Sequence, residues 1–147
     1  MRGSGRSDAH AGAMGSRRLL RPADADDLRL LAEVVVAPDG ASVACVERRL
    51  DVVSDGLRSR VLVVSVATGE VRTVSPDDAL DAAPAWLPDG RGLVIRATRG
   101  ANGAGSAPGP WIVGTPDGGE RPWPGVPQGS GAFAVAPDGR SIVVVVA

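Results

Sequence analysis

The sequence is poor in the residues that most often build reactive or metal-binding centres. Its 147 residues include one cysteine, Cys45, and one histidine, His10. A single cysteine excludes an intramolecular disulfide and a zinc site built from several cysteines. Because the one histidine lies in a glycine- and serine-rich N-terminal stretch, we expect neither a Ser-His-Asp triad nor a Cys-His pair within one copy. Cys45 lies in the apolar run "SVACVE", where we expect a buried, inert thiol.

Lysine is absent and aromatic residues make up only 3% of the chain. The 16 basic residues are all arginines, and with 17 acidic residues they give a net charge of −1. Since the arginines are scattered rather than gathered into a stripe, we expect no nucleic-acid partner. No run approaches the roughly 20 apolar residues of a membrane span, and residues 1–16 contain no signal-peptide core. We therefore expect no membrane partner, a cytoplasmic location and a flexible tail over residues 1–21.

Three short motifs resemble chemical sites but lack features that those sites require. The nearest approach to a G-x-S-x-G elbow, "GASVA" at 40–44, places Ser42 after a turn at the start of a strand, whereas the elbow joins a strand to a helix. The "DADD" run at 24–27 lacks the glycine and terminal glutamate of a calcium loop. The "GANGAGS" run at 100–106 lacks the Lys-Ser/Thr of a phosphate-binding loop. We expect no catalytic, cofactor-binding or metal-binding residue in this chain.

The tripeptide Pro-Asp-Gly is the most informative feature that is present. It favours a tight turn, because proline fixes φ, aspartate bonds its own backbone and glycine accepts a positive φ. Four copies occur, and those that begin at Pro38, Pro88 and Pro137 are 50 and 49 residues apart. Each is flanked by apolar residues at alternate positions, as in a hairpin with one face turned inward.

A second hairpin keeps the same spacing. The segment "VLVVSVATGEVRTV" at 61–74 matches "WIVGTPDGGERPW" at 111–123, with Gly69-Glu70 and Gly119-Glu120 in equivalent places. The repeating unit is thus four short strands, which is typical of a β-propeller blade. A β-sandwich is the alternative, but it gives no reason for two different turns to share one spacing. We predict an all-β, partial β-propeller of about two and a half four-stranded antiparallel blades.

The expected domain, residues 22–147, divides into blade 1 at about 33–75, blade 2 at about 83–124 and half of blade 3 at about 132–147. The segments 48–59 and 98–109 fall at one phase and are interpreted as middle loops, the second of them mobile. Trp86 is expected in the blade core, while Trp111 and Trp123 either pack between blades or line a rim. Residues 21–34 read either as a short helix or as an irregular lead-in. The helix would be capped by Asp24 or Asp26, with Leu28, Leu31 and Val34 on one face.

The order of these pieces resembles the N-terminal propeller of the prolyl oligopeptidase family of serine peptidases, in its acylaminoacyl peptidase and dipeptidyl aminopeptidase branch. The resemblance is carried by "ADADDLRLLAEVVVAPDGASVACVERRLDVVSDGLRSRVLVVSVATGEVRTVS" at 23–75 and "APAWLPDGRGLVI" at 83–95. Members begin with a short helical lead, a Pro-Asp-Gly blade, a long charged loop and a strand that ends in a Gly-Glu turn. The likeness extends over about residues 22–147.

The resemblance implies a propeller that caps an α/β-hydrolase domain and admits short peptides to it. That domain carries the catalytic Ser, Asp and His and follows the propeller in the chain, so the expectation is a non-catalytic fragment of a serine peptidase, truncated before its catalytic domain. The alternative is a TolB-like or scaffold propeller that binds a protein partner, since TolB-like propellers share Pro-Asp-Gly blades. An open propeller also leaves a blade face bare, through which the isolated chain is expected to self-associate.

Overall fold

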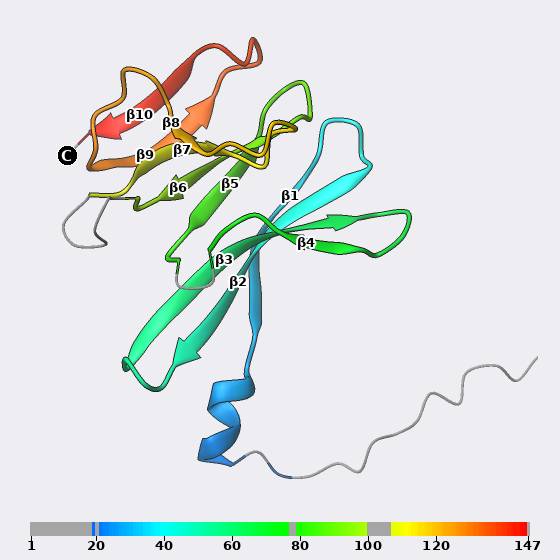
Figure 1. Ribbon diagram of the computed structural model, residues 1–147, viewed down its shortest axis with the longest axis vertical. Coiled ribbons are helices and arrows are strands. Elements are labelled where there is room, and N and C mark those ends of the chain that lie inside the picture. Colours follow the sequence, from blue (N-terminus) through cyan, green and yellow to red (C-terminus); the bar gives the residue numbers. More distant parts are fainter. Residues whose placement is uncertain (1–18, 20, 77–78, 100–106, 147) are drawn as a thin grey trace, which may run out of the picture.

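The computed structural model describes residues 19, 21–76, 79–99 and 107–146 (Figure 1). In this part of the chain the fold is all-β and partial-propeller-like, as predicted, with three antiparallel sheets and one short 3₁₀ helix, η1, at Pro22–Asp27. The strands are β1 (Leu30–Val36), β2 (Ser42–Asp51), β3 (Gly56–Ser65), β4 (Val71–Thr73), β5 (Ala82–Trp86), β6 (Leu93–Ala97), β7 (Gly109–Val113), β8 (Arg121–Pro122), β9 (Ser130–Val135) and β10 (Ile142–Val146).

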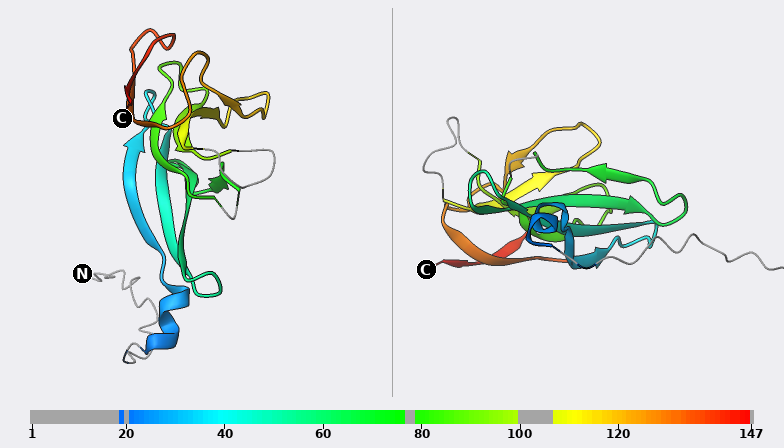
Figure 2. Two further views of the ribbon diagram at one scale, coloured as in Figure 1. Left: turned by 90° about the vertical axis from the view of Figure 1, so that its left-hand side faces the viewer. Right: turned by 90° about the horizontal axis from the view of Figure 1, so that it is seen from below.

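The three sheets follow one another along the chain. The first has the strand order β1-β2-β3-β4, the second β5-β6-β7-β8, and the third contains β9 and β10. Every pairing of neighbouring strands within a sheet is antiparallel, so each four-stranded sheet is a simple meander. Figure 2 shows the β9–β10 hairpin at the opposite end of the molecule from η1. Consecutive meanders joined by short linkers are the architecture that the 50-residue repeat predicts.

The in-phase Pro-Asp-Gly turns share one geometry. Gly40, Gly90 and Gly139 have φ values of +71°, +69° and +65°, a conformation that favours glycine. The aspartate Oδ1 of each turn accepts a hydrogen bond from the backbone N–H two residues later, at 2.8–2.9 Å. The turns also lie against one another, because a Cβ on Gly139 would approach the Pro88 side chain to 3.2 Å. The repeated tripeptide therefore fixes both the turn and its packing on the next one.

Two apolar layers hold the sheets together. The first lies between sheets one and two and is formed by fully or almost fully buried side chains: Ala44, Val46, Val61, Val63, Leu93, Ile95, Ala97 and Val113. The second lies between sheets two and three and joins Val94, Ile112 and Trp123 to partly buried partners that include Phe133, Val135 and Ile142. Because neighbouring residues of β6 point to opposite faces, Leu93 and Ile95 serve the first layer while Val94 serves the second. Each sheet is thus stabilised by its neighbour.

A β-bulge recurs at the first strand of the first two sheets. Glu33 and Ala83, 50 residues apart, both have a positive φ, +53° and +52°. In each strand the register shifts at this point. A bulge frees a backbone N–H from the ladder, and the Ala83 N–H donates to Glu33 Oε2 at 2.5 Å. Arg48 also donates to Glu33. The bulge residue of one sheet thus caps the bulge of the next.

The structure corrects the expectation of a helix over 21–34. Only η1 is helical, and Leu31 and Val34 lie in β1, with Leu31 opposite Glu47 of β2. Pro22 begins the helix and Asp24 accepts a hydrogen bond from the Arg21 N–H at 2.7 Å, but Leu28 is already extended. Pairing with β2 satisfies the backbone of the apolar residues that the helical interpretation had placed on one face. The lead-in is therefore a short 3₁₀ turn that runs into a strand.

The prediction of a middle loop at 48–59 is also wrong. Strands β2 and β3 continue through this segment to Asp51 and Gly56, in unbroken register from Ser42↔Ser65 to Asp51↔Gly56. The sequence here alternates too weakly to be recognised as strand, because both faces carry arginines. The other middle loop, at 98–109, and the tail, at 1–21, lie largely outside the described residues.

Strand β10 has an edge with no partner among the described strands, whereas the equivalent strands β2 and β6 are paired on both sides. Its Val143 and Val145 are 71% and 60% exposed, and it contains no charge. Unprotected apolar edges template pairing between molecules. We therefore expect the 147-residue chain on its own to self-associate, and Val145→Lys to raise the concentration at which light scattering begins. Val71→Lys, at a 58% exposed site in β4, is the matched control and should not.

Candidate functional site

The structure buries the one thiol that the sequence offers. Cys45 is 5% exposed in the middle of β2, which confirms the expected buried cysteine. Burial, and to a lesser extent the charge of Glu47, raises the pKa of the Cys45 thiol. A raised thiol pKa lowers the fraction of the nucleophilic thiolate at neutral pH. Ser42 lies at the first position of the same strand, as expected, and His10 lies outside the described residues.

The tryptophans contribute to packing between sheets. Trp86 packs against the first apolar layer, as expected, and its Nε1 donates to the Val35 carbonyl of β1 at 3.2 Å. Trp123 is buried in the second layer. Trp111 packs against the first layer, and the Arg99 guanidinium lies 6.0 Å from the centre of its ring. Of the two positions left open for Trp111 and Trp123, the structure selects packing between blades.

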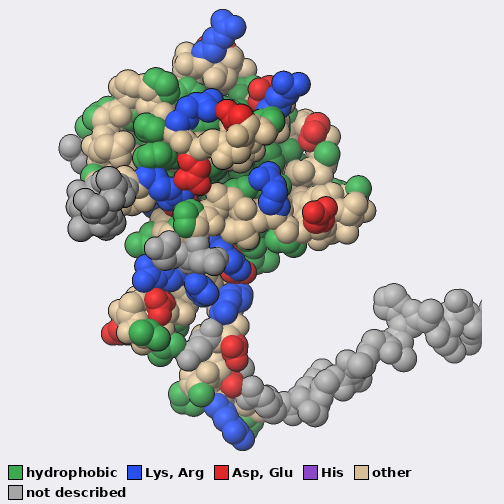
Figure 3. All heavy atoms as spheres, viewed as in Figure 1, with side chains coloured by type: hydrophobic (Ala, Val, Ile, Leu, Met, Phe, Trp, Pro, Cys, Tyr) green, Lys and Arg blue, Asp and Glu red, His purple; other side chains and the backbone are tan. Residues whose placement is uncertain are grey.

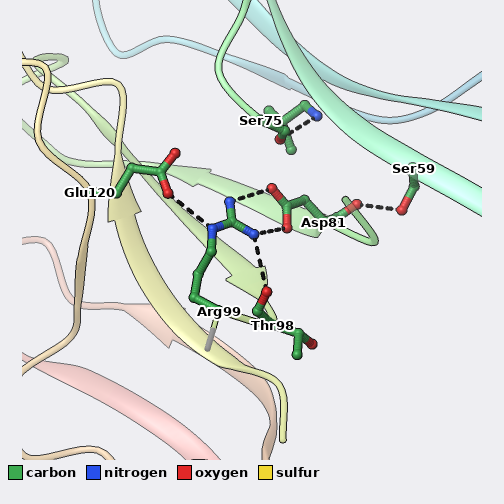
Figure 4. Close-up of polar contacts among 7 residues, drawn as sticks. Ser59, Ser75, Asp81, Thr98, Arg99 and Glu120 are labelled. Carbon is green, nitrogen blue, oxygen red and sulfur yellow. Dashed lines mark hydrogen bonds and ion pairs between the residues drawn. The ribbon is translucent and has the colours of Figure 1, made fainter. Parts of the chain in front are cut away.

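An ion-pair cluster forms around the buried Asp81, which is also hydrogen-bonded to the first sheet (Figure 4). Asp81 has no exposed surface, and both of its carboxylate oxygens accept hydrogen bonds from Arg99, each at 2.7 Å. Arg99 Nε donates to Glu120 at 2.9 Å. The Asp81 carbonyl in turn accepts a hydrogen bond from Ser59 Oγ of β3 at 2.8 Å. The cluster therefore joins the start of β5, the end of β6, the start of β8 and the first sheet.

The electrostatics of this cluster suit a structural tie. The hydrogen bonds to Asp81, and after them those to Glu120, raise the pKa of Arg99, against the opposing effect of burial. An arginine is charged throughout the accessible pH range, so it keeps the buried carboxylate paired at all times. Sequence reasoning missed the cluster. The one available signal was Asp81 itself, a lone acid at the start of an apolar strand, because such a residue is rarely buried without a partner.

The β2–β3 hairpin projects from its sheet beside η1 (Figure 1). Four residues of β2, 48–51, extend beyond the position equivalent to the end of β6. We call residues 50–57 the hairpin tip. Its exposed apolar members are Leu50, Val52, Val53 and Leu57, with 53%, 60%, 99% and 49% exposure. Figure 3 shows hydrophobic and acidic side chains together at this end of the molecule. The tip is the feature most suited to contact another surface.

Asp51 organises the turn within the hairpin tip. Its carboxylate accepts hydrogen bonds from Ser54 Oγ at 2.7 Å, from the backbone N–H groups of Val53 and Ser54, and from Arg58 Nε at 3.2 Å. These bonds, with that of the Ser54 side chain the largest contribution, lower the pKa of Asp51 to about 2. An Asx turn of this kind fixes the loop, and Asp55 adopts a φ of +47° within it. The apolar tip is therefore held in a defined shape.

The Asp51 turn should loosen in acid. A carboxyl group whose pKa is lowered on folding contributes stability above its unfolded pKa of about 4, and this contribution is lost as the pH falls through the folded value of about 2. We expect the Val53 and Ser54 amide resonances to titrate over this interval in an NMR pH series. Asp51→Asn should abolish the titration and Asp55→Asn should preserve it. Unchanged Val53 and Ser54 shifts down to pH 2 in the native sequence would contradict the assignment.

In the part of the chain that the structure describes, no helix has the length and apolar character needed to cross a bilayer. Nor does this part bring three or more His, Cys, Asp or Glu side chains together in a group that could hold a metal ion.

Comparison with known proteins finds one informative likeness. The chain is 30% identical over 125 residues to the "Uncharacterized peptidase YuxL" of Bacillus subtilis (strain 168). The aligned residues make up 83% of this chain but 18% of that protein, so the chain spans less than a fifth of its relative's length. No family model matches the chain. The likeness relates this chain to a peptidase over 83% of its length.

Proposed function

We propose that this chain forms part of the propeller of a serine peptidase of the prolyl oligopeptidase family, in the acylaminoacyl peptidase and dipeptidyl aminopeptidase branch. In this proposal the chain is non-catalytic by itself. It gates the access of short peptides to an α/β-hydrolase domain that carries the catalytic serine, aspartate and histidine. The cytoplasmic location expected from the sequence remains a prediction.

The observation that carries this proposal is the similarity to a peptidase, which extends over 83% of the chain. It agrees with the independent resemblance of the lead segment, the first Pro-Asp-Gly blade and the first long hairpin to the propellers of this family. Two complete sheets and one hairpin, each packed on the next, supply the radial arrangement that such a propeller needs. Since the aligned part is 18% of the relative, the activity belongs in this proposal to the whole polypeptide.

Gating in this proposal depends on rigid sheets. A propeller excludes large substrates only if its blades hold their positions, because an opening between blades would admit folded proteins. The Ser59–Asp81 and Glu33–Ala83 hydrogen bonds each join the first two sheets, and Arg99 holds the Asp81 side chain within the second. They act as ties between blades, one at the linker that leads into β5 and one at the first strands. Both are polar ties added to the apolar layer between the same sheets.

The test is the reading frame that encodes the chain. A segment downstream of Ala147 with a G-x-S-x-G motif followed by a histidine supports the proposal. Further Pro-Asp-Gly blades and then a stop codon would instead favour the TolB-like or scaffold propeller. At the protein level, the intact gene product is expected to cleave acyl-aminoacyl or dipeptidyl chromogenic substrates. Turnover by the purified 147-residue chain alone would refute the assignment of a non-catalytic role.

A further inference from the structure

The strand directions place the hairpin tip at the rim where the chain enters and leaves each blade. In a four-stranded antiparallel meander the first and fourth strands run in opposite directions, so the chain leaves the sheet at the rim where it entered. The β2–β3 connection lies at this same rim, and so does η1, which precedes β1 (Figure 1). Any whole number of such blades returns the chain to this rim. A domain attached before or after complete blades is therefore tethered on the side of the hairpin tip.

The two rims differ in what they expose. At the opposite rim, the tight turns at 38–41, 67–70, 88–91, 116–119 and 138–141 contain no Leu, Ile or Val, and one exposed valine, Val66, directly precedes the second of them. These turns consist of Pro, Asp, Gly, Ala, Thr, Ser, Glu and Arg, which are small or polar residues that are commonly exposed to solvent. The hairpin tip, in contrast, exposes Leu50, Val52, Val53 and Leu57. Val53 is 99% exposed although the fold would allow a polar residue there. The hairpin tip thus gathers four exposed apolar side chains within eight residues, at the rim that carries the polypeptide connections.

We propose that the hairpin tip docks on the peptidase domain of the same polypeptide and so fixes the propeller over it. This inference rests on the proposed function. The peptidase domain is the favoured partner for the tip because the aligned residues make up only 18% of the related peptidase. Most of the polypeptide then lies outside this chain, and it is tethered at the rim from which the tip projects. The partner surface is an apolar patch of the peptidase domain.

The hairpin is built to hold the tip in place. Strand β3 pairs with β2 without a bulge over all ten of its residues, from Ser65 to Gly56. Cross-strand ion pairs reinforce the stem: Arg60 Nε lies 2.8 Å from Glu47 Oε1, and Arg58 Nε lies 3.2 Å from Asp51 Oδ2. A rigid stem lowers the entropy lost on docking. The tip can therefore serve as a fixed contact point rather than a flexible loop.

Thiol labelling of the intact gene product tests the docking. Val53→Cys places a thiol at the tip, and Ala67→Cys places one at an exposed site in the β3–β4 turn at the other rim. Cys45 is buried and stays unlabelled in the folded protein. We expect a bulky maleimide to react about tenfold more slowly at position 53 than at position 67 in the intact protein, because a docked tip must open first. In the 147-residue chain the two rates should be similar.

A second pair of variants separates docking from folding. Val52→Asp and Val66→Asp introduce the same charge at sites that are each 60% exposed: Val52 lies in the β2–β3 turn, and Val66 directly follows β3. In the Val53→Cys background, Val52→Asp should restore fast labelling and Val66→Asp should not. Equal labelling at positions 53 and 67 in the intact peptidase would overturn the docking while leaving the proposed function standing. Protection that disappears on dilution would show a second copy at the tip and overturn it too. A gene product without a peptidase domain would overturn both proposals.

Discussion

Arg99→Met is expected to lower the free energy of unfolding by about 3–5 kcal/mol, because it leaves the buried Asp81 carboxylate without its partner. Asp81 has no exposed surface, and both of its oxygens depend on Arg99. Methionine replaces the stem of arginine with an apolar chain of similar shape, but it lacks the guanidinium and donates no hydrogen bond. The effect is measured by urea denaturation at neutral pH, where an unpaired buried carboxylate costs most.

Arg121→Met is the matched control for this loss. Its guanidinium lies 3.8 Å from Asp117, and both side chains are more than half exposed. Surface pairs of this kind contribute less than about 1 kcal/mol. Adding Asp81→Asn to Arg99→Met should recover part of the lost stability, since the amide carries no charge. If Arg99→Met were no more destabilising than Arg121→Met, the Arg99–Asp81 ion pair would not make the contribution to stability that its burial indicates.

Leu93→Ala is expected to cost about 2–5 kcal/mol, the range for a large-to-small change in a close-packed core. Leu93 is 1% exposed and belongs to the apolar layer between the first two sheets. Because repeated sheets are stabilised by their interfaces with their neighbours, a cavity here weakens both sheets at once. Unfolding followed by circular dichroism in urea should therefore show a lower midpoint for the whole described fold.

Leu31→Ala makes the same chemical change at a side chain that is 65% exposed in β1. Exposed substitutions away from special features change stability by about 0.5 kcal/mol or less. The difference between the two leucine variants measures the contribution of the layer between the sheets. Equal losses for Leu93→Ala and Leu31→Ala would mean that the first two sheets are not held by this layer.

The features that could be predicted from the sequence are those that repeat. The turns at Pro38, Pro88 and Pro137 combine local backbone preferences with a fixed spacing, and both are visible in the sequence. The all-β class and the meander pairing follow from them and are confirmed. The turn residues succeed as signals because proline and glycine restrict the backbone whatever surrounds them.

The features that the sequence did not indicate depend on contacts between distant segments. Leu31 and Val34 fit a helical face, yet pairing of β1 with β2 makes them part of a strand. The strands over 48–51 and 56–59 were hidden by arginines, whose ion pairs with carboxylates across the hairpin become visible only in three dimensions. Asp81 and Arg99 are 18 residues apart, and nothing in their spacing indicates that they meet. The local sequence pattern thus predicts that strands β2 and β3 exist, but their length depends on ion pairs across the hairpin that the pattern does not reveal.

The contact between adjacent turns has a consequence for how such a molecule can diversify. Gly139 lies so close to Pro88 that even a methyl group would meet it at 3.2 Å, so a longer turn at one blade would displace the turn beside it. At this crowded rim, the packing of each turn on its neighbour restricts the length of both turns. At the other rim, strands β2 and β3 of the first sheet extend into a long hairpin that projects from the sheet (Figure 1). A hairpin that projects from its sheet can change in length and sequence without displacing the packed turns at the opposite rim.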